Sequence, residues 1–263
     1  MPTMRARSVA TLERYVSTIA HAHNLADLPD PMRTAYVKGA FRQLTRGRPT
    51  SQPKQALRWE HIGHALDTLD TGSRTWDLRA KALLAVAYSM MARRAELVAL
   101  TVERIKVDEH GEGIALIYMS TVDREVPRFL SREVVAHLRA WLEHAGITSG
   151  RVFRRIENTG IAAARALHPQ EVARILQRVA RAMNTVDAAN RWPDLGLGAH
   201  STRIGAAHNM VAAGIDLTSI MHAGGWNDPK MPRYYARELA AKDSGMARLV
   251  RTRPSRRNSF ENT

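Results

Sequence analysis

Apolar residues recur at helical spacing along most of the chain. In residues 8–23, for example, Val9, Leu12 and Ile19 fall on one face of a helix. The densest apolar pattern occupies residues 75–92. The same periodicity predicts helices over residues 8–23, 32–44, 59–69, 75–92, 93–100, 131–145, 170–183 and 236–250.

Strand character is concentrated in one region near the middle of the chain. Residues 101–107, 114–119 and 124–129 form three short runs of strand character, separated by turn sequences at 108–111 and 120–123. Consecutive strands joined by short turns pair in antiparallel fashion. The sequence therefore predicts a mainly α fold with one small antiparallel β-sheet.

The clearest linker is GRPTSQPK, which occupies residues 47–54. The helices before it are too few to bury a core of their own. We therefore expect residues 1–56 to be a partial N-terminal helical segment with its linker. Residues 57–250 would form the main domain, and the basic residues 251–263 a flexible tail.

The balance of charge points to a polyanionic partner. Lys and Arg number 39 against 25 Asp and Glu in 263 residues, which gives a formal net charge of +14 spread along the chain. The absence of cysteine excludes disulfides and thiolate metal sites. No apolar run is long enough to span a membrane, and we expect a soluble cytoplasmic protein.

The strongest candidate chemistry lies in residues 198–235, GAHSTRIGAAHNMVAAGIDLTSIMHAGGWNDPKMPRYY. His200 and Arg203 are three residues apart at the expected start of a helix, so both side chains would share one face. That helix is expected to run to the glycine pair before Trp226. Arginine binds phosphate oxygens through paired N–H groups, histidine exchanges protons near neutral pH, and a tyrosine hydroxyl can form a covalent intermediate. Together these groups suit a phosphodiester.

A second arginine stands earlier in the chain, where ARRAEL places Arg93 three residues before Glu96. On its own this pair fits a salt bridge at a helix end equally well. The order of an arginine, a small sheet, the HxxR motif, a tryptophan and a tyrosine resembles the tyrosine recombinase (phage integrase) family. The matching stretches span about residues 8–250 and are ARRAEL, GAHSTRIGAA, IMHAGGW, the tyrosine nine residues after the tryptophan, and ARELAAKDSGMARLV.

The resemblance implies the DNA breaking-rejoining fold and a metal- and ATP-independent, site-specific DNA recombinase. In that family, residues 1–56 would be part of the core-DNA-binding domain with its linker, and residues 57–250 would be the catalytic domain. Such an enzyme would cut and rejoin duplex DNA through a 3′-phosphotyrosyl intermediate and exchange strands through a Holliday junction, with no cofactor and no metal ion. Two arginines would clamp the scissile phosphate, the histidine would handle a proton, and Tyr235 rather than the adjacent Tyr234 would be the nucleophile. The matching catalytic positions are Arg93, His200, Arg203, Trp226 and Tyr235, with Glu96 orienting the first arginine.

One family feature is missing from the turn between the second and third strands. The family usually carries a lysine there as general acid, but this turn reads MSTVDREV, with Asp123 near the matching place and Arg124 as the nearest cation. Arginine stabilises charge but is a poor proton donor near neutral pH. Three interpretations stay open: Arg124 substitutes electrostatically, cleavage is slow, or the chain is a decayed relative.

The expected partner is double-stranded DNA. By resemblance the working unit would be a homotetramer on paired recombination sites, monomeric or dimeric off DNA and associated with the nucleoid in the cytoplasm, not with a membrane. The helix beyond Tyr235 would dock into a neighbouring subunit. Two alternatives are a DNA-binding remnant without efficient strand transfer and an enzyme of the type IB topoisomerase kind, which would relax supercoils without a second site.

Overall fold

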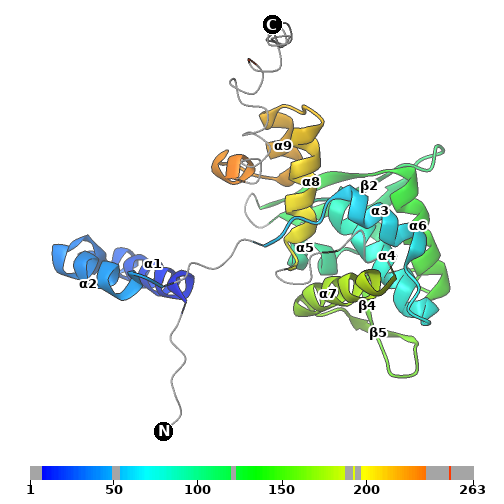
Figure 1. The fold of residues 1–263 in the computed structure, drawn as a ribbon, viewed down its shortest axis with the longest axis horizontal. Helices are drawn as coiled ribbons and strands as arrows, with labels where there is room; N and C mark the ends of the chain where they lie inside the picture. The colour runs from blue at the N-terminus through cyan, green and yellow to red at the C-terminus, as the bar shows by residue number, and fades with distance from the viewer. Residues whose placement is uncertain are drawn as a thin grey trace, which may run out of the picture. The chain divides into compact units, whose positions relative to one another are not determined.

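A computed structural model describes the fold in two compact units, residues 1–53 and 54–263 (Figure 1). Each unit is described by itself. The described residues are 8–48, 54–119, 123–186, 192, 197–234 and 249.

The N-terminal unit contains two helices, α1 (Val9–Leu25) and α2 (Ala35–Thr45), with a 3-10 turn at Pro31–Arg33 between them. Ser8 and Thr34 cap the two helices, because their side-chain oxygens accept hydrogen bonds from backbone N–H groups three residues later. None of the described residues 8–48 is buried. These two helices bury no core of their own, as expected from the sequence. That residues 1–56 are part of a larger helical module stays a prediction.

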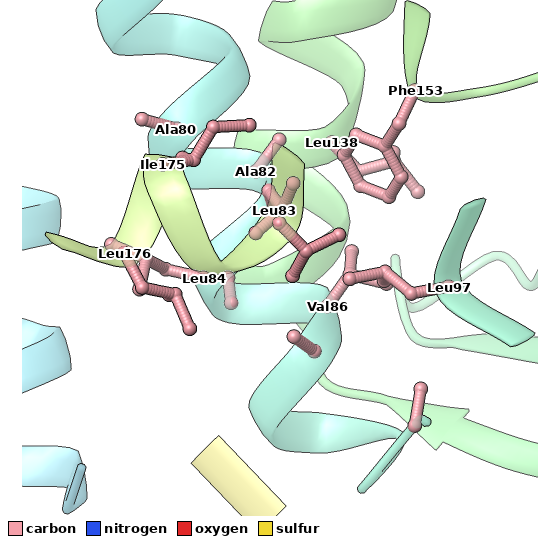
Figure 2. Packing of buried hydrophobic residues seen from close by; sticks show 14 of the residues in the cluster. Ala80, Ala82, Leu83, Leu84, Val86, Leu97, Leu138, Phe153, Ile175 and Leu176 are labelled. Carbon is pink, nitrogen blue, oxygen red and sulfur yellow. The ribbon is translucent and has the colours of Figure 1, made fainter. Parts of the chain in front are cut away.

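The second unit is built around helix α4 (Arg74–Ser89), which contacts four other helices and strand β3. Its apolar residues lie on several sides, so neighbouring elements bury it almost completely. Figure 2 shows side chains from α4 and from the elements that cover it meeting in one core. The other helices are α3 (Trp59–Thr68), α5 (Arg94–Ala99), α6 (Arg132–His144), α7 (Pro169–Val186), α8 (Ser201–Ala212) and α9 (Leu217–Gly224).

Three strands form the antiparallel sheet expected from the sequence: β1 (Ile105–Val107), β2 (Gly113–Met119) and β3 (Arg124–Leu130). A 3-10 turn at Val102–Arg104 leads into β1. Ala115, Ile117 and Met119 are buried and the residues between them are more exposed, which is the period of two expected for a sheet with one face on the core.

A second sheet was not expected from the sequence. Strands β4 (Arg154–Ile156) and β5 (Ala162–Ala166) pair in antiparallel fashion, so the prediction of one sheet was wrong in this detail. The predicted class, mainly α with small antiparallel sheets, is confirmed.

The expected long helix after His200 is two helices. Gly214 has a φ of +74° and ends α8, and Asp216 then caps α9 by accepting a hydrogen bond from the Ser219 N–H. A similar difference ends α4 at Ser89 rather than at residue 92, because Met91 has a φ of +47°.

Helix α8 packs closely against the residues that precede α3. The Leu57 N–H donates to the Ser201 carbonyl at 2.8 Å, and a Cβ added at Gly205 would lie 1.8 Å from the Leu57 carbonyl oxygen. Asn209 of α8 accepts hydrogen bonds through its Oδ1 from the Trp59 N–H and the Tyr88 hydroxyl. These contacts fix the start of α8, where the candidate site lies.

Candidate active site

Arg93 and Glu96 form the first part of the site, at the N-terminus of α5. Glu96 accepts two hydrogen bonds of 2.7 Å, one from the Arg93 backbone N–H and one from its Nη1. The Arg93 side chain is 32% exposed, whereas that of Glu96 is 10% exposed. Glu96 thus holds a guanidinium that is still partly exposed. The contact is a salt bridge at a helix end, and its role in orienting Arg93 toward a phosphate stays a prediction.

Arg203, in the first turn of α8, is turned into the protein and is 3% exposed. Its Nη1 donates to the Met91 carbonyl at 2.7 Å, and its Nη2 donates to the Gly224 carbonyl at 2.5 Å. The left-handed backbone of Met91, unusual for a residue other than glycine, lies next to the N-terminal end of α5. Arg203 therefore links the chain after α4 to the end of α9. Its two acceptors, Met91 and Gly224, each lie two residues from another candidate residue, Arg93 and Trp226.

Trp226 follows the C-terminal end of α9 and packs against Arg203. The Arg203 Cζ lies 4.1 Å from the centre of the Trp226 ring, a cation–π arrangement. Gly225 has φ +62° and ψ +47°, and the N–H groups of Gly225 and Trp226 donate to the His222 and Met221 carbonyls. This is the Schellman ending of a helix. This turn directs the chain so that the Trp226 ring lies over the Arg203 guanidinium.

Gly224 is required for that placement. A Cβ on residue 224 would lie 2.0 Å from Cζ3 of the Trp226 ring, closer than any real contact. The glycine pair that the sequence suggested as a helix break therefore also makes room for the tryptophan.

His200 lies at the N-cap of α8 and is exposed, unlike Arg203 three residues later. The protein atoms around its ring and the positive charges of Arg203, Arg93 and Arg94 lower the pKa of His200 below its usual value of 6.5, while Glu96 opposes them. The imidazole is therefore neutral near neutral pH and able to accept a proton.

Arg124 and Tyr235 are not placed in this group. Arg124 is exposed at the start of β3, where it pairs with Met119 of β2, and its side chain has no hydrogen bond or ion pair with another described residue. Asp123 before it has a φ of +49° and accepts a hydrogen bond from the Tyr118 hydroxyl. Tyr235 lies outside the described residues, so its role and its preference over Tyr234 stay predictions.

Arg128 is a residue of this region that the sequence did not single out. It is 5% exposed in β3, and its Nη1 donates to the His222 carbonyl at 2.9 Å. The signal available in the sequence was an arginine at an inward-facing position of a strand, two residues before Leu130.

Within the described residues there is no group of three or more His, Asp or Glu side chains arranged to hold a metal ion.

Comparison with known proteins agrees with this arrangement. The sequence model of the phage integrase family matches residues 55–242, which is more than half of the chain. The chain therefore belongs to the phage integrase family, and its class is that of a site-specific DNA recombinase or integrase. The class predicted from the sequence is confirmed.

Among curated proteins, the chain is similar to the recombinase Cre of Escherichia phage P1. The two are 26% identical over 264 residues, covering 94% of this chain and 76% of Cre. Cre is also the relative that the quoted motifs suggest, and that resemblance is confirmed.

Solved structures support the fold. A Tn1549 transposon integrase in complex with circular intermediate DNA matches with a TM-score of 0.64 and 14% identity, covering 94% of this chain and 81% of that one. A XerH site-specific recombinase bound to a palindromic difH substrate matches with a TM-score of 0.56 and 17% identity, covering 90% of this chain and 66% of XerH. At these identities the matches show that the catalytic fold is shared.

Proposed function

We propose that this chain cuts and rejoins duplex DNA through a 3′-phosphotyrosyl link at Tyr235, with Arg93, His200, Arg203 and Trp226 activating the scissile phosphate. The observation that supports this most is the arrangement of Arg203, whose guanidinium bonds the Met91 and Gly224 carbonyls and packs against the Trp226 ring. Two guanidiniums, an imidazole and an indole are thus gathered within one unit of the fold. Groups of these kinds can stabilise the charge that develops on a phosphate under attack without a metal ion.

In the first step the Tyr235 oxygen attacks the phosphorus, a phosphorus–tyrosine bond forms, and the bond from phosphorus to the 5′-oxygen breaks. The neutral His200 imidazole accepts the tyrosine proton, and the 5′-oxygen leaves as a hydroxyl after taking a proton from solvent water. The reverse reaction with a 5′-hydroxyl reseals the strand and conserves the energy of the bond, because the phosphotyrosine replaces one ester with another.

Negative charge grows on the non-bridging phosphate oxygens during this attack. Arg203 is held by two backbone carbonyls and by the Trp226 ring, and Arg93 is held by Glu96, so both cations are oriented before DNA binds. Preorganised charge of this kind stabilises a transition state without reorganisation, and loss of one such donor typically costs about 10²–10³ in rate. Arg124 would add electrostatic stabilisation at the leaving oxygen, with the proton coming from another donor.

The proposed partner is double-stranded DNA, in agreement with the net charge of +14 and with the DNA substrates of the matched XerH and Tn1549 proteins. We further propose a homotetramer on paired sites, exchange through a Holliday junction, and association with the nucleoid in the cytoplasm. No helix within the described ranges is long and apolar enough to cross a membrane.

A suicide substrate tests the proposal. A nicked duplex from the protein's own genomic neighbourhood is incubated with wild type, Tyr235→Phe and Tyr234→Phe, and covalent adducts are resolved on a denaturing gel. We expect an adduct from wild type and from Tyr234→Phe but none from Tyr235→Phe, since removal of the hydroxyl removes the nucleophile. Tyr234→Phe is the matched control, because it changes the same side chain one residue away.

Other results would contradict the proposal. An adduct that survives Tyr235→Phe and disappears with Tyr234→Phe would move the nucleophile. Retarded DNA without any adduct would favour the DNA-binding remnant. Relaxation of supercoiled DNA that carries a single site, without strand exchange between two sites, would favour an enzyme of the topoisomerase IB kind.

A further inference from the structure

Burying the charged side chain of Arg128 is energetically unfavourable, and its presence in the core needs an explanation. It is 5% exposed, and burial lowers the pKa of its guanidinium below its ordinary value. Its Nε is buried and has no hydrogen-bond partner among the described residues. An unpaired buried donor is unfavourable, and a leucine or methionine would pack at such an inward-facing strand position without this penalty.

The contacts of Arg128 connect the three-stranded sheet to the C-terminal end of α9. Its Nη1 donates to the His222 carbonyl at 2.9 Å, and its Nη2 lies 3.4 Å from the Met119 sulfur. A Cβ on Gly225 would lie 2.9 Å from that Nη2 and 2.3 Å from the Met119 methyl carbon. The left-handed Gly225 therefore packs directly against the arginine and the methionine.

Two arginines consequently hold the same helix end from different elements. Arg128 of β3 bonds the His222 carbonyl, and Arg203 of α8 bonds the Gly224 carbonyl. Cations at a helix C-terminus also complement its partial negative charge. The chain that leaves this clamp is Trp226, followed by the segment that leads to Tyr235.

Arg128 also lies within electrostatic reach of the first part of the site. The charges of Glu96 and Arg93 both act on the pKa of Arg128, in opposite directions. The Nη1 and Nη2 groups of Arg128 are directed at a carbonyl and a sulfur of the protein itself. These contacts favour an effect of Arg128 on the site through the C-terminal end of α9 that it holds.

We infer that Arg128 is a positioning residue for strand cleavage, because it fixes the C-terminal turn of α9, and with it Trp226, against the sheet beside Arg93. This inference rests on the proposed function for its consequence in catalysis. Its structural part, the placement of Trp226, does not depend on that function.

Arg79 provides a matched control within the same unit. It is also a buried arginine, 6% exposed, with one hydrogen bond from its Nη1 to a backbone carbonyl and an unpartnered buried Nε among the described residues. It lies in α4 nearly three turns before the end at Ser89, which is roughly 15 Å along the helix. Arg79→Met therefore removes the same chemistry away from the site.

The experiment compares Arg128→Met, Arg128→Lys and Arg79→Met in two measurements. The first is the single-turnover rate of adduct formation on the nicked duplex at saturating protein, together with the DNA dissociation constant. The second is the ¹⁹F NMR signal of Trp226 in DNA-free protein labelled with 5-fluorotryptophan, assigned by Trp226→Phe. Thermal melting accompanies both.

We expect Arg128→Met to lower the saturated cleavage rate by about 10- to 100-fold, the size of effect that small misplacements of reacting groups produce. DNA affinity should change little, the Trp226 signal should shift or broaden, and the melting temperature should not fall below that of Arg79→Met. Arg128→Lys should recover part of the rate, because an ammonium can still donate to the His222 carbonyl. Arg79→Met should leave the rate and the Trp226 signal as in wild type.

A rate for Arg128→Met within about twofold of Arg79→Met would overturn the inference, whatever the NMR signal does. A lower rate with an unmoved Trp226 signal would overturn it as well, since Arg128 would then act by another route. If wild type forms no adduct, the proposed function fails, and the Trp226 signal alone then decides whether Arg128 holds this turn.

Discussion

At the scale of single residues, Arg203 shows how one side chain organises the site. A buried guanidinium is unfavourable unless its N–H groups are paired. Here the carbonyls of Met91 and Gly224 pair them, and the Trp226 ring covers the cation. The orientation of the charge is thus set by the fold before any phosphate arrives.

The sequence predicted the neighbourhood of His200 and Arg203 but not their different environments. The i, i+3 spacing places the two residues one turn apart at the start of α8. Arg203 turns inward because its acceptors come from the ends of α4 and α9, which are distant in the sequence. Arg128 was missed for a related reason, since its acceptor in α9 lies 94 residues away.

The protonation of His200 provides a prediction at this scale. A positive neighbour disfavours the imidazolium, so the pKa of His200 should lie below 6.5, and removing a positive charge should raise it. We expect Arg94→Gln to shift the titration of His200 to higher pH, and the acid limb of the cleavage rate to follow in the same direction. NMR titration of the histidine Cε1–H signals at low ionic strength, with His200 assigned by His200→Gln, measures the pKa directly.

Arg139→Gln is the control for this titration. It removes an exposed arginine from α6 whose charge does not act on the pKa of His200. A wild-type His200 that titrates at or above 6.5, or an unchanged titration in Arg94→Gln, would contradict the electrostatic description of the site.

At the scale of elements, the apolar periodicity was enough to predict the helices of the core. Helices α4 and α6 carry apolar residues at helical spacing, and β2 alternates in the manner of a strand with one buried face. Such patterns predict the elements well because the apolar residues that form the pattern are the ones buried in the core.

The elements that were missed lack a pattern of this kind. Strand β5 reads AAARA, without β-branched or aromatic residues, and is held by pairing with β4. The division between α8 and α9 depends on the left-handed conformation of Gly214. The apolar residues on both sides of Gly214 continue at helical spacing, so the periodicity predicts one helix. Both features are decided by tertiary context rather than by local preference.

A glycine substitution tests the packing of α8 against the start of the unit. Because a Cβ at residue 205 would lie 1.8 Å from the Leu57 carbonyl oxygen, Gly205→Ala must move either α8 or the backbone at Leu57. We expect a loss of about 1–3 kcal/mol, as for overpacked cores. Thermal melting would fall by about 2–4 °C for each kcal/mol in a unit of this size.

Gly63→Ala in α3 is the control for this variant. The nearest atom to a Cβ there is Nε1 of Trp59 at 3.8 Å, an ordinary contact. Alanine in a helix interior is favoured over glycine by about 0.5–1 kcal/mol, so this variant should melt at or above the wild-type temperature. Equal melting of Gly205→Ala and wild type would show that the approach of α8 to Leu57 is looser than described.

At the scale of the whole molecule, the site is assembled by one unit from elements that are far apart in the chain. The end of α4, the start of α5, the start of α8 and the end of α9 each contribute a residue or a carbonyl. The match to the phage integrase family covers residues 55–242, and the contact pattern divides the chain after Pro53. The proposed chemistry would therefore be carried by the second unit, and the expected role of residues 1–56 in binding DNA is a separate prediction.

The identity of the covalent bond tests the central claim most directly. Adduct formed by wild type on the nicked duplex would be digested with nuclease and protease, and the residual nucleotide located by tandem mass spectrometry. We predict a nucleotide joined through its 3′-phosphate to Tyr235, with a free 5′-hydroxyl on the released strand. A nucleotide on Tyr234, a link through a 5′-phosphate, or the absence of any modified tyrosine from a retarded complex would contradict the account.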